Sequence, residues 1–152
     1  MADNKRVAAR ILDEVWSQGR FEAIEELCDD KFESRMPIVG KVDRSSLKET
    51  IGAYRKAFPD LKFEVKDILF EGDKGVIRWV GSGTNKGSFM GMAPTNKFAK
   101  VHGVTFVEFK NGKSLKEYVH YDVLTFLDSL GIKLPIGMAP PAPSETRPEL
   151  RH

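Results

Sequence analysis

The stretch KNGKSLKEYVHYDVLTFLDSLG, residues 110–131, contains a tight turn, a strand, a short helix and several ionisable side chains. Asn111-Gly112 separates two segments of alternating polarity, and both residues tolerate the positive φ that a two-residue hairpin turn requires. Residues 114–121 are therefore predicted to form a strand. An apolar helix is predicted to begin directly after Asp122.

Side chains alternate across a strand, so Tyr118, His120 and Asp122 share one face of this strand. That face carries a phenol, an imidazole and a carboxylate in a row, and we expect it to line a ligand pocket. Asp122 is also positioned to cap the helix that follows. Spacing alone does not favour a catalytic role over this capping role.

The position of His102 depends on how the hairpin turns. If Gly112 takes the left-handed position of a three-residue bulged turn, His102 lies opposite His120 on the pocket face, and we adopt this register. A plain two-residue turn places His102 on the other face. Two histidines and a carboxylate could form a metal-binding triad, but they would have to converge across two strands, so no metal is expected.

The first half of the chain has helical periodicity. Apolar residues between Val7 and Trp16 recur at helical spacing and predict an amphipathic helix that ends near Gly19. A shorter helix is predicted at residues 21–28, and an extended segment at 32–38. Ser46 and Glu49 have the spacing of a capping box, which predicts a third helix ending before Pro59.

From residue 61 onward the period is that of strands. Strands are predicted at 63–70, 76–89, 98–109 and 114–121, joined as an antiparallel meander. Three glycines at 81, 83 and 87 predict bulges or bends that curl the sheet. Helices followed by a strongly bent antiparallel sheet give an α+β fold, a cone-shaped barrel in which the sheet wraps three N-terminal helices and encloses a pocket.

The composition bounds the possible functions. The 152 residues include 24 basic and 22 acidic side chains, scattered rather than clustered, which argues against nucleic acid as a partner. A single domain is expected at 1–133, followed by a proline-rich mobile tail at 134–152. The only cysteine, Cys28, cannot form an intrachain disulfide. No stretch is apolar for long enough to span a membrane, so no membrane partner and a cytoplasmic location are expected.

Several further residues are candidates for binding a substrate. Arg78 and Trp79 face opposite sides of their strand, so only one of them can line the pocket. Arg78 could hold an anionic or carbonyl group, or pair with an acid at the rim. The candidate apolar walls, each with a core role as its alternative, are Trp16, Tyr54, Met90, Met92 and Phe106.

Four segments, in their order and spacing, resemble one known family. They are AFPDLKFEV at 57–65, FEGDKGVIRWVGSGTNKGSFMGMAPT at 70–95, VTFVEFKNGK at 104–113 and EYVHYDVLTFLDSLG at 117–131. Together they are similar to the SnoaL-like polyketide cyclases, also called ester cyclases, of the nuclear transport factor 2-like superfamily. The resemblance covers most of residues 46–131.

The resemblance implies a nuclear transport factor 2-like, cystatin-like cone that forms a homodimer through the outer sheet face. It further implies a cofactor-free intramolecular aldol condensation of a polyketide ester, with Asp122 as the general base. The chain departs from the family at Tyr118, where tryptophan is frequent. It also has Ser129-Leu130-Gly131 where Gln-Leu-Gly is common, so the substrate is expected to differ.

We therefore predict that Asp122 removes a C–H proton from a small apolar carbonyl or polyketide-like compound. A shielded carboxylate suits this step because burial raises its pKa. His120 would donate to the substrate oxygen or hold the base in place, and His102 is a further catalytic candidate. A structural role is the alternative for each histidine. Two alternatives use the same fold, namely a non-catalytic binder of a small ligand and a dimeric interaction module.

Overall fold

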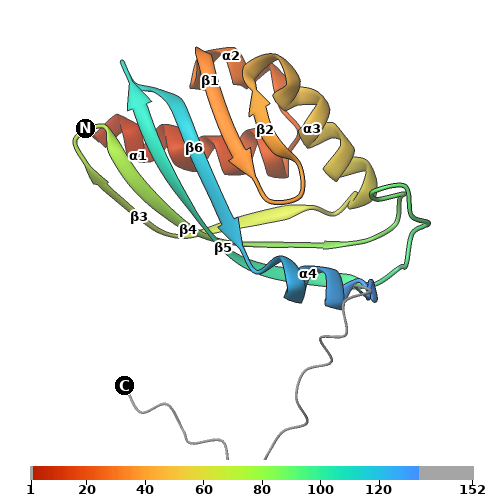
Figure 1. Ribbon diagram of the computed structural model, residues 1–152. Coiled ribbons are helices and arrows are strands. Elements are labelled where there is room, and N and C mark those ends of the chain that lie inside the picture. Colours follow the sequence, from red (N-terminus) through yellow and green to blue (C-terminus); the bar gives the residue numbers. More distant parts are fainter. Residues whose placement is uncertain (1, 134–152) are drawn as a thin grey trace, which may run out of the picture.

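The computed structural model describes residues 2–133, and the predicted tail at 134–152 lies outside the described residues. One six-stranded sheet curls around a layer of helices, with strand order β2-β1-β6-β5-β4-β3 (Figure 1). The elements are α1 (Ala2–Arg10), η1 (Ile11–Ser17), η2 (Phe21–Ala23), α2 (Ile24–Leu27), β1 (Cys28–Met36), β2 (Gly40–Asp43), α3 (Arg44–Ala57), β3 (Lys62–Glu71), β4 (Lys74–Thr84), β5 (Phe98–Lys110), β6 (Lys113–Tyr121) and α4 (Val123–Ser129). The predicted α+β fold is confirmed, although the curled sheet is not closed into a barrel.

The N-terminal helix ends where its periodicity predicts. The α1 helix continues into the π-helical segment η1, which ends at Ser17, and Gly19 follows with a φ of +70°. Its buried side consists of Ala8, Ile11, Leu12 and Val15, at the predicted helical spacing. This stripe packs onto the concave side of the sheet.

The α3 helix begins earlier than predicted. Asp43 is its N-cap, because the Asp43 carboxylate accepts a hydrogen bond from the Ser46 N–H at 2.9 Å. The Ser46 hydroxyl in turn accepts from the Asp43 N–H at 3.1 Å, so Ser46 closes the capping box from inside the helix. The helix ends at Ala57, before Pro59, as expected. No helix in the described part of the chain is long and apolar enough to cross a membrane.

Strands β3 to β6 form the predicted antiparallel meander, but the complete sheet is mixed. The β1 strand runs parallel to β6 and antiparallel to β2. The prediction placed only an extended segment in this region. The β1 sequence, CDDKFESRM, has few apolar residues, so its strand character is weak without the neighbouring β6.

The glycines of β4 do not mark bulges, contrary to expectation. The β4 strand ends at Thr84 and pairs with β5 without interruption, whereas register shifts occur on β3, β1 and β6. Gly81 and Gly83 leave room for aromatic rings instead. A Cβ on Gly81 would lie 2.9 Å from a Phe63 ring carbon, and one on Gly83 would lie 3.0 Å from the Phe58 Cβ. Aromatic side chains can therefore approach the β4 backbone closely.

The β5–β6 hairpin also differs from the predicted register. Asn111 and Gly112 have φ values of +50° and +78°, and Lys110 pairs with Lys113, so the turn is a plain two-residue turn. A separate register shift follows at Leu115, between the Phe109–Ser114 and Glu108–Lys116 pairs. The predicted three-residue bulged turn is therefore wrong.

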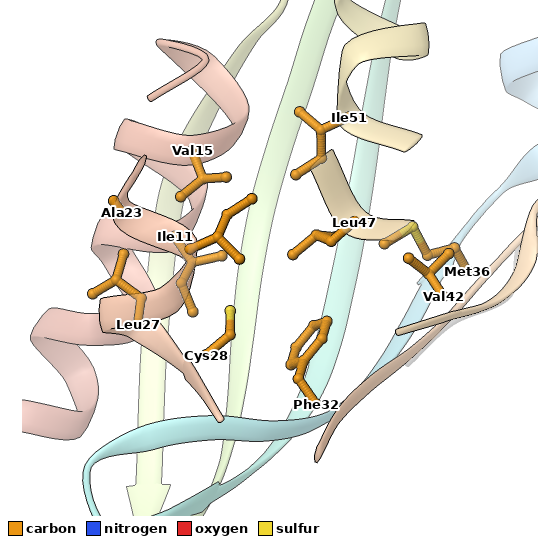
Figure 2. Close-up of a cluster of buried hydrophobic side chains, with 11 residues drawn as sticks. Ile11, Val15, Ala23, Leu27, Cys28, Phe32, Met36, Val42, Leu47 and Ile51 are labelled. Atoms are coloured by element: carbon orange, nitrogen blue, oxygen red, sulfur yellow. The ribbon is translucent and has the colours of Figure 1, made fainter. Parts of the chain in front are cut away.

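The largest core cluster fills the space between the helical layer and strands β1 and β2 (Figure 2). Leu47 and Ile51 of α3 face Phe32 of β1, while Ile11 and Val15 come from η1. This cluster anchors the helices to the part of the sheet that the meander does not include.

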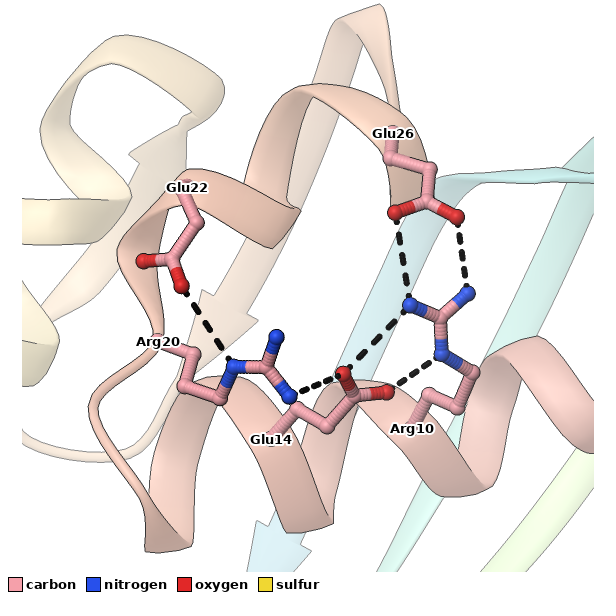
Figure 3. Close-up of polar contacts among 5 residues, drawn as sticks. All are labelled: Arg10, Glu14, Arg20, Glu22 and Glu26. Atoms are coloured by element: carbon pink, nitrogen blue, oxygen red, sulfur yellow. Dashed lines mark hydrogen bonds and ion pairs between the residues drawn. The ribbon is translucent and has the colours of Figure 1, made fainter.

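Ion pairs link the first helical segment to α2 (Figure 3). Arg10 bonds both carboxylate oxygens of Glu26, at 2.9 and 3.3 Å, and also pairs with Glu14. Arg20 bridges Glu14 at 3.1 Å and Glu22 at 3.4 Å. Surface pairs add little stability individually, so this network supplements the core packing of Ile24 and Leu27, which holds α2 against the first helix.

Candidate functional site

A cavity of about 110 Å³ lies between the concave face of the sheet and the helical layer. A water-sized group needs roughly 10–15 Å³ of such a cavity, so there is room for roughly ten non-hydrogen atoms. The lining side chains are mostly aliphatic and aromatic. Such a cavity suits a small, largely apolar ligand.

Aromatic rings form a closed ring of contacts around this cavity. Neighbouring centroids are 5.1 to 6.2 Å apart, mostly in tilted or edge-to-face arrangements. In order, the side chains are Tyr54, Trp16, Phe63, Trp79, Tyr121, Phe126 and Phe89. All of them except Phe89 line the cavity. Edge-to-face packing holds each ring in place and gives the ligand a stiff aromatic wall.

A carboxyl group, that of Glu117 on β6, projects into this apolar setting. Glu117 lines the cavity and is only 8% exposed. Its Oε1 accepts a hydrogen bond from the Ser114 hydroxyl at 3.2 Å. Burial raises the pKa of Glu117 to about 7, although the bond from Ser114 opposes this change. Glu117 can therefore exchange a proton near neutral pH.

Sequence reasoning missed Glu117 because it chose the wrong face of β6. The alternation was correct, but Glu117, Val119 and Tyr121 line the cavity, whereas Tyr118 and His120 do not. A charged residue between Leu115 and Val119 on an otherwise apolar strand face is the signal that could have identified it.

Trp79 and Thr105 form a second polar contact in the cavity wall. The Trp79 Nε1–H donates to the Thr105 hydroxyl oxygen at 2.9 Å, and both side chains are buried. Gly103 makes room for this indole, since a Cβ there would lie 2.2 Å from the Trp79 ring. The indole is thereby held against β5.

Two phenols face the cavity from opposite elements, Tyr54 from α3 and Tyr121 from β6. Burial raises the pKa of both hydroxyls. Both groups therefore stay neutral near pH 7 and can act as hydrogen-bond donors.

Several predicted site residues lie on the outer face of the sheet instead. Two rows of paired residues cross this face, Leu69–Val76–Phe106–Tyr118 and Asp67–Arg78–Val104–His120. His102 lies on the same side, next to Val104 in the alternation. The expectation that Tyr118, His120 and His102 face the pocket is thus wrong, because the alternate residues of β5 and β6 occupy the concave face. Phe106 is also outside the cavity, and Arg78 pairs with Asp67 at 2.7 Å.

Asp122 caps α4, which is one of the two roles, capping and catalysis, between which the sequence spacing did not decide. It is exposed, and its carboxylate accepts from the Thr125 N–H at 3.0 Å and from the Thr125 hydroxyl at 2.6 Å. These bonds lower the pKa of Asp122, which leaves a weaker base. Asp122 is not among the residues that line the cavity. Its catalytic role remains a prediction.

The remaining candidates divide between the cavity and the surface. Trp16 and Tyr54 line the cavity. Met90 is exposed on the turn after β4 and borders a separate groove with Ile38, and Met92 is exposed on the same turn. Burial raises the pKa of the Cys28 thiol, so this cysteine is a poor nucleophile. No group of three potential metal ligands is present among the described residues.

The curled sheet, the helical layer and the cavity between them form a ketosteroid isomerase-like, or nuclear transport factor 2-like, fold. The chain matches the model of the SnoaL-like polyketide cyclase family over residues 6–130. It therefore belongs to the SnoaL-like polyketide cyclase family. No curated protein sequence matches the chain.

Solved structures share this fold. A "putative SnoaL-like polyketide cyclase" from Jannaschia sp. CCS1 is 21% identical, with a TM-score of 0.79 over 88% of this chain and 94% of that one. AclR, a "putative hydroxylase" from Streptomyces galilaeus, is 27% identical, with a TM-score of 0.75 over 89% and 84%. A protein with a ketosteroid isomerase-like fold from Catenulispora acidiphila is 13% identical, with a TM-score of 0.71 over 84% and 93%.

Proposed function

We propose that this protein is an enzyme that binds a small apolar carbonyl or polyketide-like compound in the cavity and removes a C–H proton next to the carbonyl group. The observation that carries the proposal is a cavity surrounded by a closed circle of aromatic side chains, into which the carboxyl group of Glu117 projects. An interaction module would need no such space. Family membership supports the same class of chemistry.

Each part of the site has a chemical task. The circle of seven aromatic side chains binds the carbon skeleton of the substrate and excludes water. The absence of water strengthens every polar contact inside the cavity. Neutral hydroxyl donors in the wall stabilise negative charge on the substrate oxygen as the proton leaves. A carboxylate accepts the proton. The resemblance assigns this role to Asp122, whereas the position in the cavity favours Glu117.

The cavity size favours a one- or two-ring substrate over a large fused polycycle. A planar phenol such as 2-naphthol has the shape of a bicyclic enolate and is a suitable probe. We expect it to bind with a Kd on the order of 10 µM, because an apolar ligand of this size gains roughly 0.6 kcal/mol per atom. Binding should change the fluorescence of Trp16 and Trp79, which both line the cavity.

Calorimetry and tryptophan fluorescence measure this binding, and two substitutions on β5 locate it. Ala99 lines the cavity, so Ala99→Leu should weaken binding by filling the space. The next residue, Lys100, is exposed, and Lys100→Leu serves as the control. Equal binding by wild-type protein and Ala99→Leu would place the ligand elsewhere. Tight binding of 2-naphthol combined with no turnover of any ketone would identify a non-catalytic binder.

We also propose that two copies of the chain associate through the outer sheet face. The row Leu69–Val76–Phe106–Tyr118 gives this face an apolar stripe, and Val104 adds to it. A charge in the stripe should separate the copies, because an unpaired charge is costly to bury. Light scattering should therefore report a dimer for wild-type protein and a monomer for Phe106→Glu. The control variant Leu124→Glu, which changes an exposed residue of α4, should remain a dimer. A monomeric wild-type protein would contradict the proposal.

A further inference from the structure

Glu117 has no charged partner among the described residues, although it is almost completely buried. Ser114 bonds its Oε1, and within residues 2–133 no hydrogen bond is made to Oε2. An acid kept for structure alone is normally paired or bonded through both oxygens. Oε2 thus remains available to a molecule in the cavity.

A hydroxyl donor lies diagonally across from this carboxyl on the neighbouring strand. Glu117 pairs with Val107, and Thr105 is two residues along β5 on the same face. Diagonal neighbours in an antiparallel pair are separated by roughly 7–8 Å, which leaves space for a substrate between the two side chains. The Thr105 oxygen accepts from the Trp79 indole, so its own hydrogen is directed away from Trp79.

We infer that Glu117 is the general base of this site and that Thr105 donates a hydrogen bond to the substrate oxygen. This inference rests on the proposed function and names the residues that perform it. The C–H bond next to the carbonyl breaks, and the proton moves to Oε2 of Glu117. The electron pair forms the C=C bond of an enolate, and the carbonyl π electrons move to the oxygen that Thr105 faces.

The bound enolate can then react in two ways with balanced atoms and electrons. Glu117 returns the proton to a different carbon, which gives an isomer. Alternatively, the enolate carbon attacks a second carbonyl of the same substrate, and the new alkoxide takes the proton from Glu117, which gives an aldol ring. Both routes regenerate the Glu117 carboxylate.

Ser34 provides a second, independent observation at this position. Its hydroxyl is fully buried and has no hydrogen-bond partner in the described part of the chain. Ser34 is the direct neighbour of Glu117 on the parallel strand β1. An unpaired buried hydroxyl is unfavourable. The unpaired Ser34 hydroxyl is therefore a second donor on the strand next to Glu117, in addition to the Ser114 hydroxyl that already bonds Oε1.

The charged groups around Glu117 leave this acid to titrate on its own. From β1, the titratable neighbour is the Cys28 thiol, and α3 contributes Arg44, which donates to the Cys28 carbonyl at 3.4 Å. Lys113 begins β6 and bonds the Glu25 carbonyl at 3.0 Å. The cavity-lining residues of β5 and α1, such as Thr105 and Ala8, are all uncharged. Burial is the main cause of the raised Glu117 pKa, which suits a base that works near pH 7.

Hydrogen–deuterium exchange at the carbon next to the carbonyl of 2-tetralone, followed by NMR in D₂O, tests the inference without knowledge of the natural substrate. Glu117→Gln should lower the protein-catalysed exchange rate by about 100-fold or more and leave 2-naphthol binding intact. Thr105→Val should lower kcat by about 100-fold with a smaller change in KM. Asp128→Asn, an exposed acid on α4, is the matched control and should exchange at the wild-type rate.

The pH profile separates the two carboxylates. With Glu117 as the base, exchange rises with pH and levels off above about pH 7. With Asp122 as the base, it is already level in mildly acidic solution, and Asp122→Asn, which preserves a capping side chain, abolishes it. Loss of exchange in Asp122→Asn together with full exchange in Glu117→Gln would overturn the inference.

The same experiment distinguishes the inference from the function on which it rests. Wild-type protein that exchanges 2-tetralone, combined with equally fast exchange by Glu117→Gln, contradicts Glu117 as the base and leaves the proposed function standing. Wild-type protein that neither binds nor exchanges contradicts the proposed function itself, and the inference with it.

Discussion

Glu117→Gln is expected to stabilise the folded protein by about 3 kcal/mol at pH 8, because the wild-type protein must bury a carboxylate there. The pKa of Glu117 rises from an ordinary 4.5 to about 7 on folding, a difference that corresponds to about 3 kcal/mol. Between these pH values the folded state holds more protons than the unfolded state. The contribution of Glu117 therefore favours folding below about pH 4.5 and is lost as the pH rises to about 7.

Urea unfolding of both proteins at several pH values between 4 and 8 measures this effect. Other carboxylates, such as Asp43 and Asp122, have lowered pKa values and destabilise the fold as the pH falls. The informative quantity is therefore the difference between the two proteins at each pH. It should be near zero at pH 4 and greatest above pH 7. A difference that does not change with pH would mean that Glu117 ionises as freely as an exposed acid.

Leu47→Ala is expected to cost about 3 kcal/mol of unfolding free energy, because Leu47 lies at the centre of the largest core cluster (Figure 2). It is 1% exposed and packs between α3 and the sheet. The loss should appear as a lower urea midpoint with an unchanged slope, since the cavity leaves the surface exposed on unfolding nearly the same.

Leu124→Ala is the matched control, since it makes the same chemical change within another helix. Leu124 is 54% exposed on α4, so its truncation should change stability by less than about 0.5 kcal/mol. Equal losses at the two positions would mean that α3 does not pack on the sheet as described. The cluster also positions β1, so Leu47→Ala should weaken 2-naphthol binding as well.

Leu47 and Glu117 make opposite contributions to the stability of the fold. Leu47 represents the apolar packing that holds the helices inside the sheet, whereas Glu117 is an acid that weakens the fold at neutral pH. Residues that reduce stability in this way are commonly kept for function. Glutamine at position 117 would keep the bond from Ser114 and remove the charge, which is why stability and activity should change in opposite directions.

The local elements were predictable from the sequence. The apolar spacing from Val7 to Trp16 determines an amphipathic helix, and Asn111-Gly112 determines a hairpin, because both signals depend on neighbouring residues only. The helix after Asp122 and the antiparallel meander followed from the same kind of local pattern. The family resemblance was also carried by short segments and is confirmed over residues 6–130.

The candidate site was decided by tertiary structure. Alternation divides β6 into two sets of side chains but does not say which set faces the helices, so Tyr118 and His120 were placed in the pocket while Glu117 was overlooked. The register shift at Leu115 and the parallel pairing of β1 with β6 depend on contacts between distant segments.

The circle of aromatic side chains is the clearest example of a feature that depends on contacts between distant segments. Its seven side chains come from η1, α3, α4, strands β3, β4 and β6, and the segment after β4. Each of them reads in the sequence as an ordinary core residue. Helical and strand periods determine which side of an element is apolar, because they reflect the geometry of one segment. The packing of the helices against the curled sheet decides which aromatic side chains surround the cavity. The same packing decides that Glu117 is the acid buried in its wall.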